Sequence, residues 1–173
     1  MPLDRGQIAA LLAAAADELT GDWLLVGGAA AAVWFAADRV TEDIDLVSLA
    51  GTQADRLALL ELGERSGLAP EALNSAADYF VRRIPGWERE LELHLRGRGA
   101  AIHRPSVTLF LLLKLGRLSE QDLADCEALL AFARAGGVGW DAERVRAAID
   151  ATAPTSDLAL RQRRDRLREL LSG

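Results

Sequence analysis

The order of apolar and polar residues predicts a first region in which strands and helices alternate. Residues 22–26, DWLLV, are almost all apolar, as expected for a short strand buried on both faces. Asp4 and Gln7 have the spacing of a capping box, which would open a helix over residues 5–19 that ends before Gly21. Further helices are predicted over residues 29–37, 52–66 and 70–81.

A second strand is predicted over residues 40–49, VTEDIDLVSL. Side chains alternate between the two faces of a strand, so Ile44 and Leu46 share one face, while Asp43 and Asp45 share the other. Two carboxylates on one face of a mostly apolar strand need a partner, because unpaired charges are rarely buried.

A third strand is predicted over residues 89–97, RELELHLRG. Its leucines alternate with Glu90, Glu92 and His94, which predicts one apolar and one polar face. His103 is assigned to a turn.

From Pro105 onward the pattern is helical, with helices expected over residues 106–117, 120–135, 142–151 and 157–171. The sequence therefore predicts an α+β fold. Residues 1–104 would form a small mixed β-sheet flanked by helices, and residues 105–173 would form a helical lobe.

Composition narrows the possible partners and compartment. The net charge of −6 over 173 residues gives no general attraction for nucleic acid or an anionic membrane. A single cysteine, Cys126, excludes an internal disulfide and a multi-cysteine zinc site, and fits a reducing cytoplasm. No apolar run approaches the roughly 20 residues of a membrane helix, and the N-terminus lacks a signal-peptide pattern. We expect a cytoplasmic protein with no membrane partner.

Arginines offer the local basic patches that a nucleic-acid contact would need. The run over residues 161–170 is more typical of a solvated helix face than of a nucleic-acid site. A second set lies around the third predicted strand and comprises Arg82, Arg83, Arg96, Arg98 and Arg104. If both sets face the same side, they would form a track for phosphate groups.

The paired aspartates predict a site for a hard divalent cation. Asp43 and Asp45 would lie about 7 Å apart at Cα on one face, so their carboxylates could share Mg²⁺ or Mn²⁺. Two such ions commonly serve phosphoryl or nucleotidyl transfer. A third carboxylate often completes such a site; Glu92 is favoured, and Glu90 is the alternative if the strand register differs.

The glycine pair Gly27–Gly28 separates the first predicted strand from the next helix. Such a turn leaves backbone N–H groups free at a helix N-terminus and removes side chains that would block a phosphate. The stretch GGAAAA lacks the glycine spacing of a dinucleotide-binding fingerprint.

The combination of a strand, Gly27–Gly28, a helix and the stretch RVTEDIDL (residues 39–46) resembles the nucleotidyltransferase superfamily. The closer likeness is to small bacterial AbiEii-type proteins of toxin–antitoxin and abortive-infection systems, whose Arg-x-Thr-x-Asp-hydrophobic-Asp form is similar to this stretch. Two looser likenesses are LNSAADYF (residues 73–80), at the place of an Asn-containing helix, and a Lys then Asp-x-x-Asp helical segment, here Lys114, Asp122 and Asp125.

The resemblance implies the roles of several residues. Metal would be bound by Asp43 and Asp45, with Glu92 as the third carboxylate. Nucleotide triphosphate would be bound by Gly27, Gly28, Arg39, Thr41, Lys114, Asp122 and Asp125, with Lys114 on phosphate. Simpler roles stand beside these: Asp122 is placed to cap a helix with Ser119, and Arg39 could neutralise the aspartates.

The implied activity is transfer of a nucleoside monophosphate from an NTP to an acceptor hydroxyl on tRNA, protein or a small molecule, with Mg²⁺ or Mn²⁺ as cofactor. A toxin role with a cognate antitoxin is implied by the family likeness alone. The alternative is a catalytically degenerate module of the same fold that binds nucleotide or a partner protein, and the lack of a third carboxylate would favour it.

Overall fold

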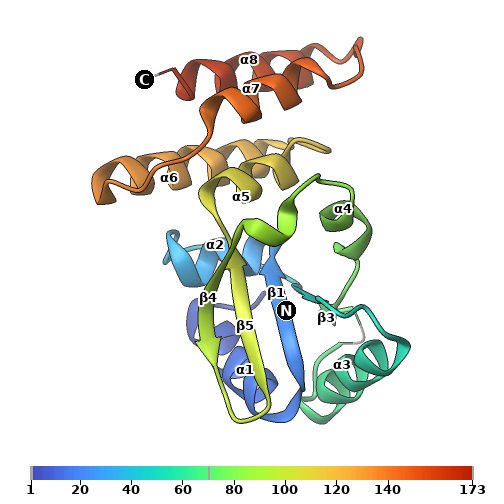
Figure 1. Cartoon of the computed structure of the whole chain (residues 1–173). Helices are drawn as coiled ribbons and strands as arrows, with labels where there is room; N and C mark the ends of the chain where they lie inside the picture. The colour runs from blue at the N-terminus through green and yellow to red at the C-terminus, as the bar shows by residue number, and fades with distance from the viewer. Residues whose placement is uncertain (1, 70, 173) are drawn as a thin grey trace. The chain divides into compact units, whose positions relative to one another are not determined.

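The computed structural model describes residues 2–69 and 71–172 (Figure 1). The chain divides into two compact units, Met1–Pro105 and Ser106–Gly173, and the sequence analysis placed this division one residue earlier. Residues 1, 70 and 173 lie outside the described residues. Residue 70 is the first residue of the helix predicted over 70–81, and residues 1 and 173 are the outer ends of the two predicted lobes.

The predicted α+β class is confirmed, because the described part of the first unit contains one five-stranded mixed sheet and that of the second unit is helical. The elements of the first unit are α1 (Arg5–Glu18), β1 (Gly21–Val26), α2 (Gly27–Trp34), β2 (Ile44–Ser48), α3 (Gln53–Arg65), β3 (Leu73–Asn74), α4 (Asp78–Arg82), the 3₁₀ helix η1 (Trp87–Arg89), β4 (Leu91–Arg96) and β5 (Ala100–Pro105).

The strands lie in the order β3-β2-β1-β5-β4, with β1 at the centre (Figure 1). β1 is antiparallel to β2, with Val26 opposite Asp45, and parallel to β5. The end of β1 therefore lies beside the start of β2. β3 runs parallel to β2 and places Asn74 opposite Asp45.

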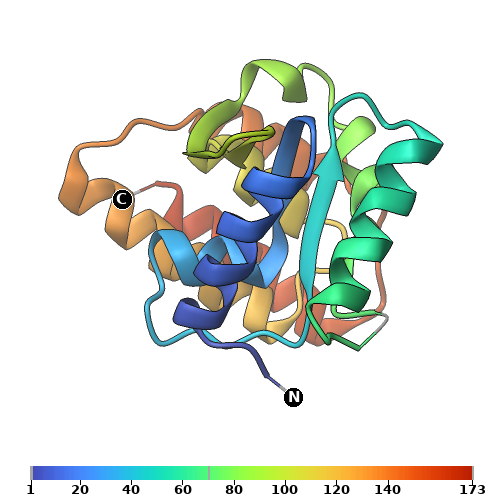
Figure 2. The same cartoon turned by 90° about the horizontal axis from the view of Figure 1, so that it is seen from below.

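Helices cover the central strand, whose side chains from Trp23 to Val26 are all buried, as the apolar sequence predicts. α1 begins at the predicted capping box of Asp4 and Gln7 and buries Ile8 and Leu12. It contacts α2, β4 and β5, while α3 contacts β3 and α1 (Figure 2). This packing holds the end of β1, where the glycine pair begins.

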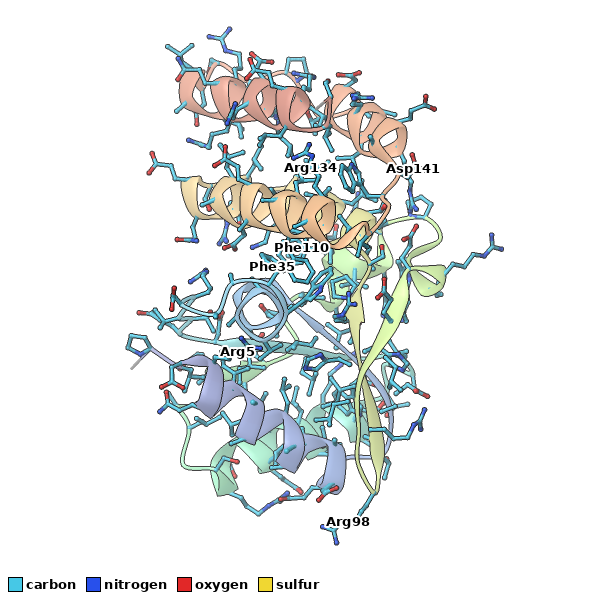
Figure 3. All side chains as sticks on the ribbon, turned by 90° about the vertical axis from the view of Figure 1, so that its left-hand side faces the viewer. Arg5, Phe35, Arg98, Phe110, Arg134 and Asp141 are labelled. Carbon is cyan, nitrogen blue, oxygen red and sulfur yellow. The ribbon has the colours of Figure 1, made fainter. Side chains whose placement is uncertain are left out.

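The β4–β5 hairpin was not predicted, and the assignment of His103 to a turn is wrong, because His103 lies within β5. Arg98 stands at the tip of the hairpin (Figure 3). A Cβ atom on Gly97 would come within 2.4 Å of the backbone of Ala16 in α1, so only glycine fits there. Gly97 and Gly99, between β4 and β5, thus let the hairpin close against the end of α1.

Three other predictions about the elements also differ from the structure. β2 begins at Ile44, so Asp43 precedes the strand instead of lying in it. β4 has a register shift between Leu93 and Leu95, which breaks the regular alternation expected over residues 89–97. The stretch predicted as a helix over 70–81 instead contains the short strand β3 and then α4.

In the second unit, the structure confirms all four predicted helices to within three residues at each end. They are α5 (Val107–Lys114), α6 (Glu120–Gly136), α7 (Ala142–Asp150) and α8 (Leu158–Leu170). α6 packs against α5 and α8, and α7 packs against the same two helices. In the described part of the chain, no helix has both the length and the apolar character to cross a lipid bilayer.

Candidate functional site

The start of α2 lies directly against Asp45. Gly27 has a φ of +70°, and a Cβ atom there would lie 2.9 Å from Oδ2 of Asp45. Both the left-handed backbone and the close carboxylate therefore require glycine at this position. The resemblance assigned the glycine pair and the aspartates to one nucleotide and metal site, and in the structure Asp45 lies directly beside Gly27.

Gly28 is enclosed by two more residues that the resemblance singled out. A Cβ atom on Gly28 would lie 2.9 Å from Oγ1 of Thr41 and 3.1 Å from a terminal nitrogen of Arg39. The glycine pair thus touches the segment that carries the aspartates at two successive positions. The side chains of Thr41 and Arg39 therefore occupy the space that a side chain on residue 28 would fill.

The segment that precedes β2 is anchored through Thr41. Its N–H donates to the carbonyl oxygen of Leu3 at 3.1 Å, and its carbonyl accepts from the N–H of Leu3 at 2.6 Å. The Thr41 hydroxyl donates to Oδ1 of Asp43 at 3.2 Å. Asp43 is exposed and Asp45 is half-buried. Thr41 therefore links Asp43 to the glycine turn that Asp45 contacts directly.

The N-terminus of α2 has the features of an anion-binding site. Its N-cap residue, Val26, provides no side-chain hydrogen bond, so no cap side chain takes up the first N–H groups. Gly27 and Gly28 are half-buried. N–H groups at such a helix end, together with the helix dipole, favour a phosphate group.

We expect Gly27→Ala to lower the free energy of unfolding by about 1–2 kcal/mol, because a side chain in the left-handed region is strained, and to displace the Asp45 carboxylate. Urea unfolding measures the loss. Gly139→Ala is the matched control, since Gly139 has neither a left-handed φ nor an atom within 4 Å of its Cβ position. Equal stability of the two variants would contradict the proposed contact.

The structure does not bring Glu92 to Asp45. Glu92 lies on the edge strand β4, and β5 and β1 stand between β4 and β2, a separation of roughly 14 Å at ordinary strand spacing. Its Oε2 instead accepts a hydrogen bond from Arg104 at 2.6 Å. Glu90 precedes the same strand. Neither the favoured nor the alternative third carboxylate belongs to a strand next to the aspartates.

Asn74 is the residue beside Asp45 that sequence reasoning missed. The stretch containing it was noted as part of a helix, whereas Asn74 ends β3 opposite Asp45. Its side chain accepts from the N–H of Ala76 at 2.8 Å and donates to the carbonyl of Glu71 at 2.8 Å. These bonds fold the chain around β3, so Asn74 supports the edge of the site.

In the second unit, Lys114, Asp122 and Asp125 form one buried ionic cluster. The Lys114 ammonium is 2.9 Å from Oδ1 of Asp122 and 2.9 Å from Oδ2 of Asp125. Asp122 also caps α6 with Ser119, as the simpler interpretation predicted, and accepts from Arg117 at 2.9 Å. The cluster joins the end of α5 to α6, and contact of Lys114 with phosphate stays a prediction.

The cluster also affects the pKa values of its members. Burial alone would raise the pKa of Asp122, but hydrogen bonds from Arg117 and Lys114 outweigh it and hold that pKa below its usual range. Burial raises the pKa of the neighbouring Cys126 thiol to about 12. The thiol therefore stays protonated at neutral pH and is a poor nucleophile.

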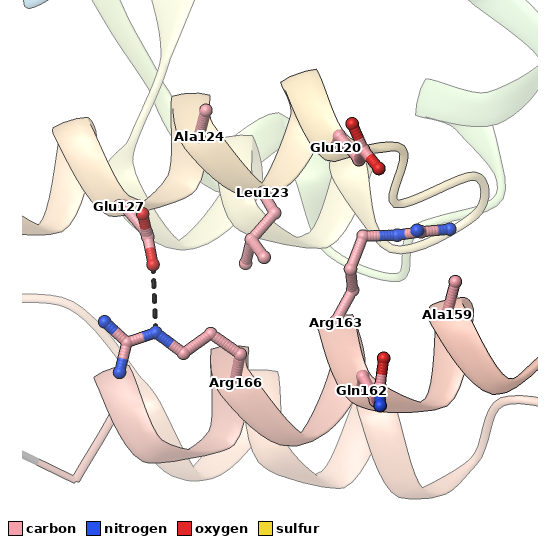
Figure 4. Close-up of a pocket in the computed structure, with 8 residues that line it drawn as sticks. All are labelled: Glu120, Leu123, Ala124, Glu127, Ala159, Gln162, Arg163 and Arg166. Carbon is pink, nitrogen blue, oxygen red and sulfur yellow. Dashed lines mark hydrogen bonds and ion pairs between the residues drawn. The ribbon is translucent and has the colours of Figure 1, made fainter.

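Many of the arginines considered for nucleic acid are engaged within their own unit. Arg166 pairs with Glu127 at 3.0 Å, and Arg168 pairs with Asp150 at 2.8 Å, which ties α8 to α6 and α7. A shallow pocket between α6 and α8 lies over Leu123 and contains the Arg166–Glu127 pair (Figure 4). Its charges have both signs, and it includes none of the predicted site residues.

The aspartate pair beside the glycine turn offers oxygen donors for a hard cation. Within residues 2–69 and 71–172, no group of three or more His, Cys, Asp and Glu side chains is arranged to hold a metal ion. Two carboxylates are nevertheless a usual protein contribution to a Mg²⁺ site, because water and substrate phosphates fill the other positions. Asp43 and Asp45 fit such a site.

The first unit therefore gathers six of the predicted residues around the end of β1 and the start of β2: Gly27, Gly28, Arg39, Thr41, Asp43 and Asp45. The second unit contains the Lys114 cluster. Comparisons of the chain with models of known protein families, with curated proteins and with solved structures gave no match.

Proposed function

We propose that this protein is a metal-dependent nucleotidyltransferase. The observation that carries the proposal is the contact of the Asp45 carboxylate with the first glycine of α2, at 2.9 Å from the Cβ position of Gly27. A carboxylate for a divalent cation lies beside a helix N-terminus whose N–H groups would bind phosphate, which is the pairing that a nucleotide triphosphate requires.

The metal would be Mg²⁺ or Mn²⁺, held by Asp43 and Asp45. When bound, it would neutralise charge on the triphosphate and on the oxygens that gain charge during transfer. The Thr41 hydroxyl, which donates to Asp43, would fix the orientation of that carboxylate. The half-buried position of Asp45 would reduce competition from water.

The backbone would bind the nucleotide phosphates. The N–H groups of Gly27 and Gly28 would donate to phosphate oxygens, and the Arg39 guanidinium, beside Gly28, would add a positive charge. The acceptor hydroxyl oxygen would attack the α-phosphorus. The α–β anhydride bond would break, pyrophosphate would leave with its electron pair, and the hydroxyl proton would pass to solvent.

The acceptor would be a hydroxyl of tRNA, of a protein or of a small molecule, and the family resemblance supports a toxin with a cognate antitoxin. Contact of Lys114 with a phosphate group would be an addition to the steps above, and its ammonium group is paired with Asp122 and Asp125.

The position of Glu92 favours a second candidate function. Glu92, on β4, is paired with Arg104, and two strands, β1 and β5, lie between β4 and β2. A degenerate module, which binds nucleotide or a partner protein without turnover, would need no third carboxylate.

Incubation of the full chain with α-labelled NTPs, Mg²⁺ or Mn²⁺ and total tRNA tests the proposal. We expect label to appear on RNA or on another acceptor, with release of pyrophosphate, and EDTA to abolish both. Saturable nucleotide binding without pyrophosphate release would favour the degenerate module. Transfer that persists in EDTA would contradict the metal mechanism.

A further inference from the structure

α4 exposes two neighbouring aromatic rings. The side chains of Tyr79 and Phe80 are 61% and 60% exposed, which is unusual for large apolar groups. Their ring centroids are 5.5 Å apart, and the ring planes meet at 83°. The two rings therefore form a small aromatic surface that is more than half exposed.

A cation lies against this surface. The Arg83 guanidinium is 5.1 Å from the centroid of the Tyr79 ring, and it donates to the Tyr79 hydroxyl. The nearby acid, Asp78, is already paired with Arg82 at 2.7 Å. Arg83 therefore gives the aromatic surface a net positive charge, although the chain as a whole is acidic.

The backbone that carries the rings is fixed to the sheet. Arg82 donates to the carbonyl of Ser48, at the end of β2, at 2.9 Å, and its guanidinium lies 5.7 Å from the Trp87 ring. Val81 is fully buried. Rings on a fixed support lose little conformational freedom when they bind a ligand.

The surface also lies within reach of the aspartates. Tyr79 is five residues after Asn74, so their Cα atoms are separated by at most about 18 Å. Asn74 is the strand partner of Asp45. A strand of a few nucleotides would span from the rings to the aspartate pair.

We propose that Tyr79, Phe80 and Arg83, here named the stacking platform, bind unpaired bases of single-stranded nucleic acid. Flat exposed rings stack on bases of any sequence, and an adjacent arginine complements the phosphate charge. The role of the bound nucleic acid as the acceptor of the nucleotide rests on the proposed function. The binding of nucleic acid to the stacking platform does not depend on that function. The positive charge favours nucleic acid over an apolar protein partner, and two rings alone are a small area for a stable protein interface.

Fluorescence anisotropy with a labelled 12-nucleotide single-stranded RNA of mixed sequence tests the stacking platform on the full chain. We expect Tyr79→Ala or Phe80→Ala to raise Kd about fivefold each, and the double variant to raise it about thirtyfold or more. Phe80→Tyr keeps a ring and should bind as the unaltered protein does. Leu57→Ala, at a 53% exposed position on α3, is the control for general loss of apolar surface.

The outcomes separate this proposal from the proposed function. Asp45→Asn should bind the RNA normally, because it leaves the rings in place. Ring-dependent RNA binding without any nucleotide transfer would support the stacking platform and count against the proposed function. Transfer to RNA with an unchanged Kd in the double variant would overturn the stacking platform. The stacking platform would also be overturned if the double variant bound RNA with an unchanged Kd but no longer self-associated in gel filtration. In that case the rings would form a contact between two copies of the chain.

Discussion

Asp45→Asn is expected to reduce nucleotide transfer by at least about a thousandfold. A bound metal ion contributes several kcal/mol of charge stabilisation to transfer, and each 1.4 kcal/mol is a factor of ten in rate. The amide has nearly the same shape as the carboxylate but lacks its charge, so the contact with Gly27 would remain while cation binding fails. Initial rates of pyrophosphate release at several Mg²⁺ concentrations measure the effect.

Asp22→Asn is the matched control for this variant. Asp22 lies in β1, toward the opposite end from Val26, where its carboxylate is 2.9 Å from Nε2 of His103. The Asp22→Asn substitution removes one negative charge from the same sheet without affecting the glycine turn, so the rate of nucleotide transfer should be unchanged. The midpoint of thermal unfolding should also match for the two variants. Transfer at the original rate in a folded Asp45→Asn protein would eliminate the metal mechanism.

The local part of the candidate site was predictable because one short stretch of the chain contains it. Strand β1, the glycine pair, α2 and the aspartates follow one another within residues 22–45. Because α2 begins where β1 ends, pairing of β1 with β2 brings the start of α2 close to the aspartates. The antiparallel pairing of Val26 with Asp45 completes this arrangement. Alternation along the strand was a weaker guide, because Asp43 precedes β2 and only Asp45 lies in it.

The third carboxylate could not be predicted in the same way, because it depends on the order of strands. β5 was not recognised: the sequence AAIHRP has no clear period of two, and its pairing joins Gly21 to Ala100, far apart in the chain. Because β5 lies between β1 and β4, Glu92 on β4 is far from β2. Local patterns carry no information about such long-range pairing.

The helical unit was predicted more closely because its signals are local. Ser119 with Asp122, and the apolar spacing of each helix, define beginnings and ends within a few residues. The local signals did not identify a protein partner for Lys114, which the resemblance assigned to phosphate. Only the packing of α5 against α6 places two carboxylates at its ammonium group.

Lys114→Met is expected to lower the free energy of unfolding by about 3–5 kcal/mol, because it leaves Asp122 and Asp125 buried without their shared cation. Arg117→Met is the matched control. Arg117 pairs with the same Asp122, but its side chain is 79% exposed, so its loss should cost no more than about 1 kcal/mol. Urea unfolding of the full chain, followed by circular dichroism, measures both.

A second change separates lost charge pairing from lost packing. Adding Asp125→Leu to Lys114→Met removes one of the stranded carboxylates, so the double variant should be more stable than Lys114→Met alone. If Lys114→Met instead costs no more than Arg117→Met, the buried cluster is not what holds α5 to α6. Because the cluster is structural, a loss of transfer in Lys114→Met is evidence for phosphate contact only if the variant remains folded. The double variant, which should keep the fold without Lys114, therefore provides the cleaner test of that contact.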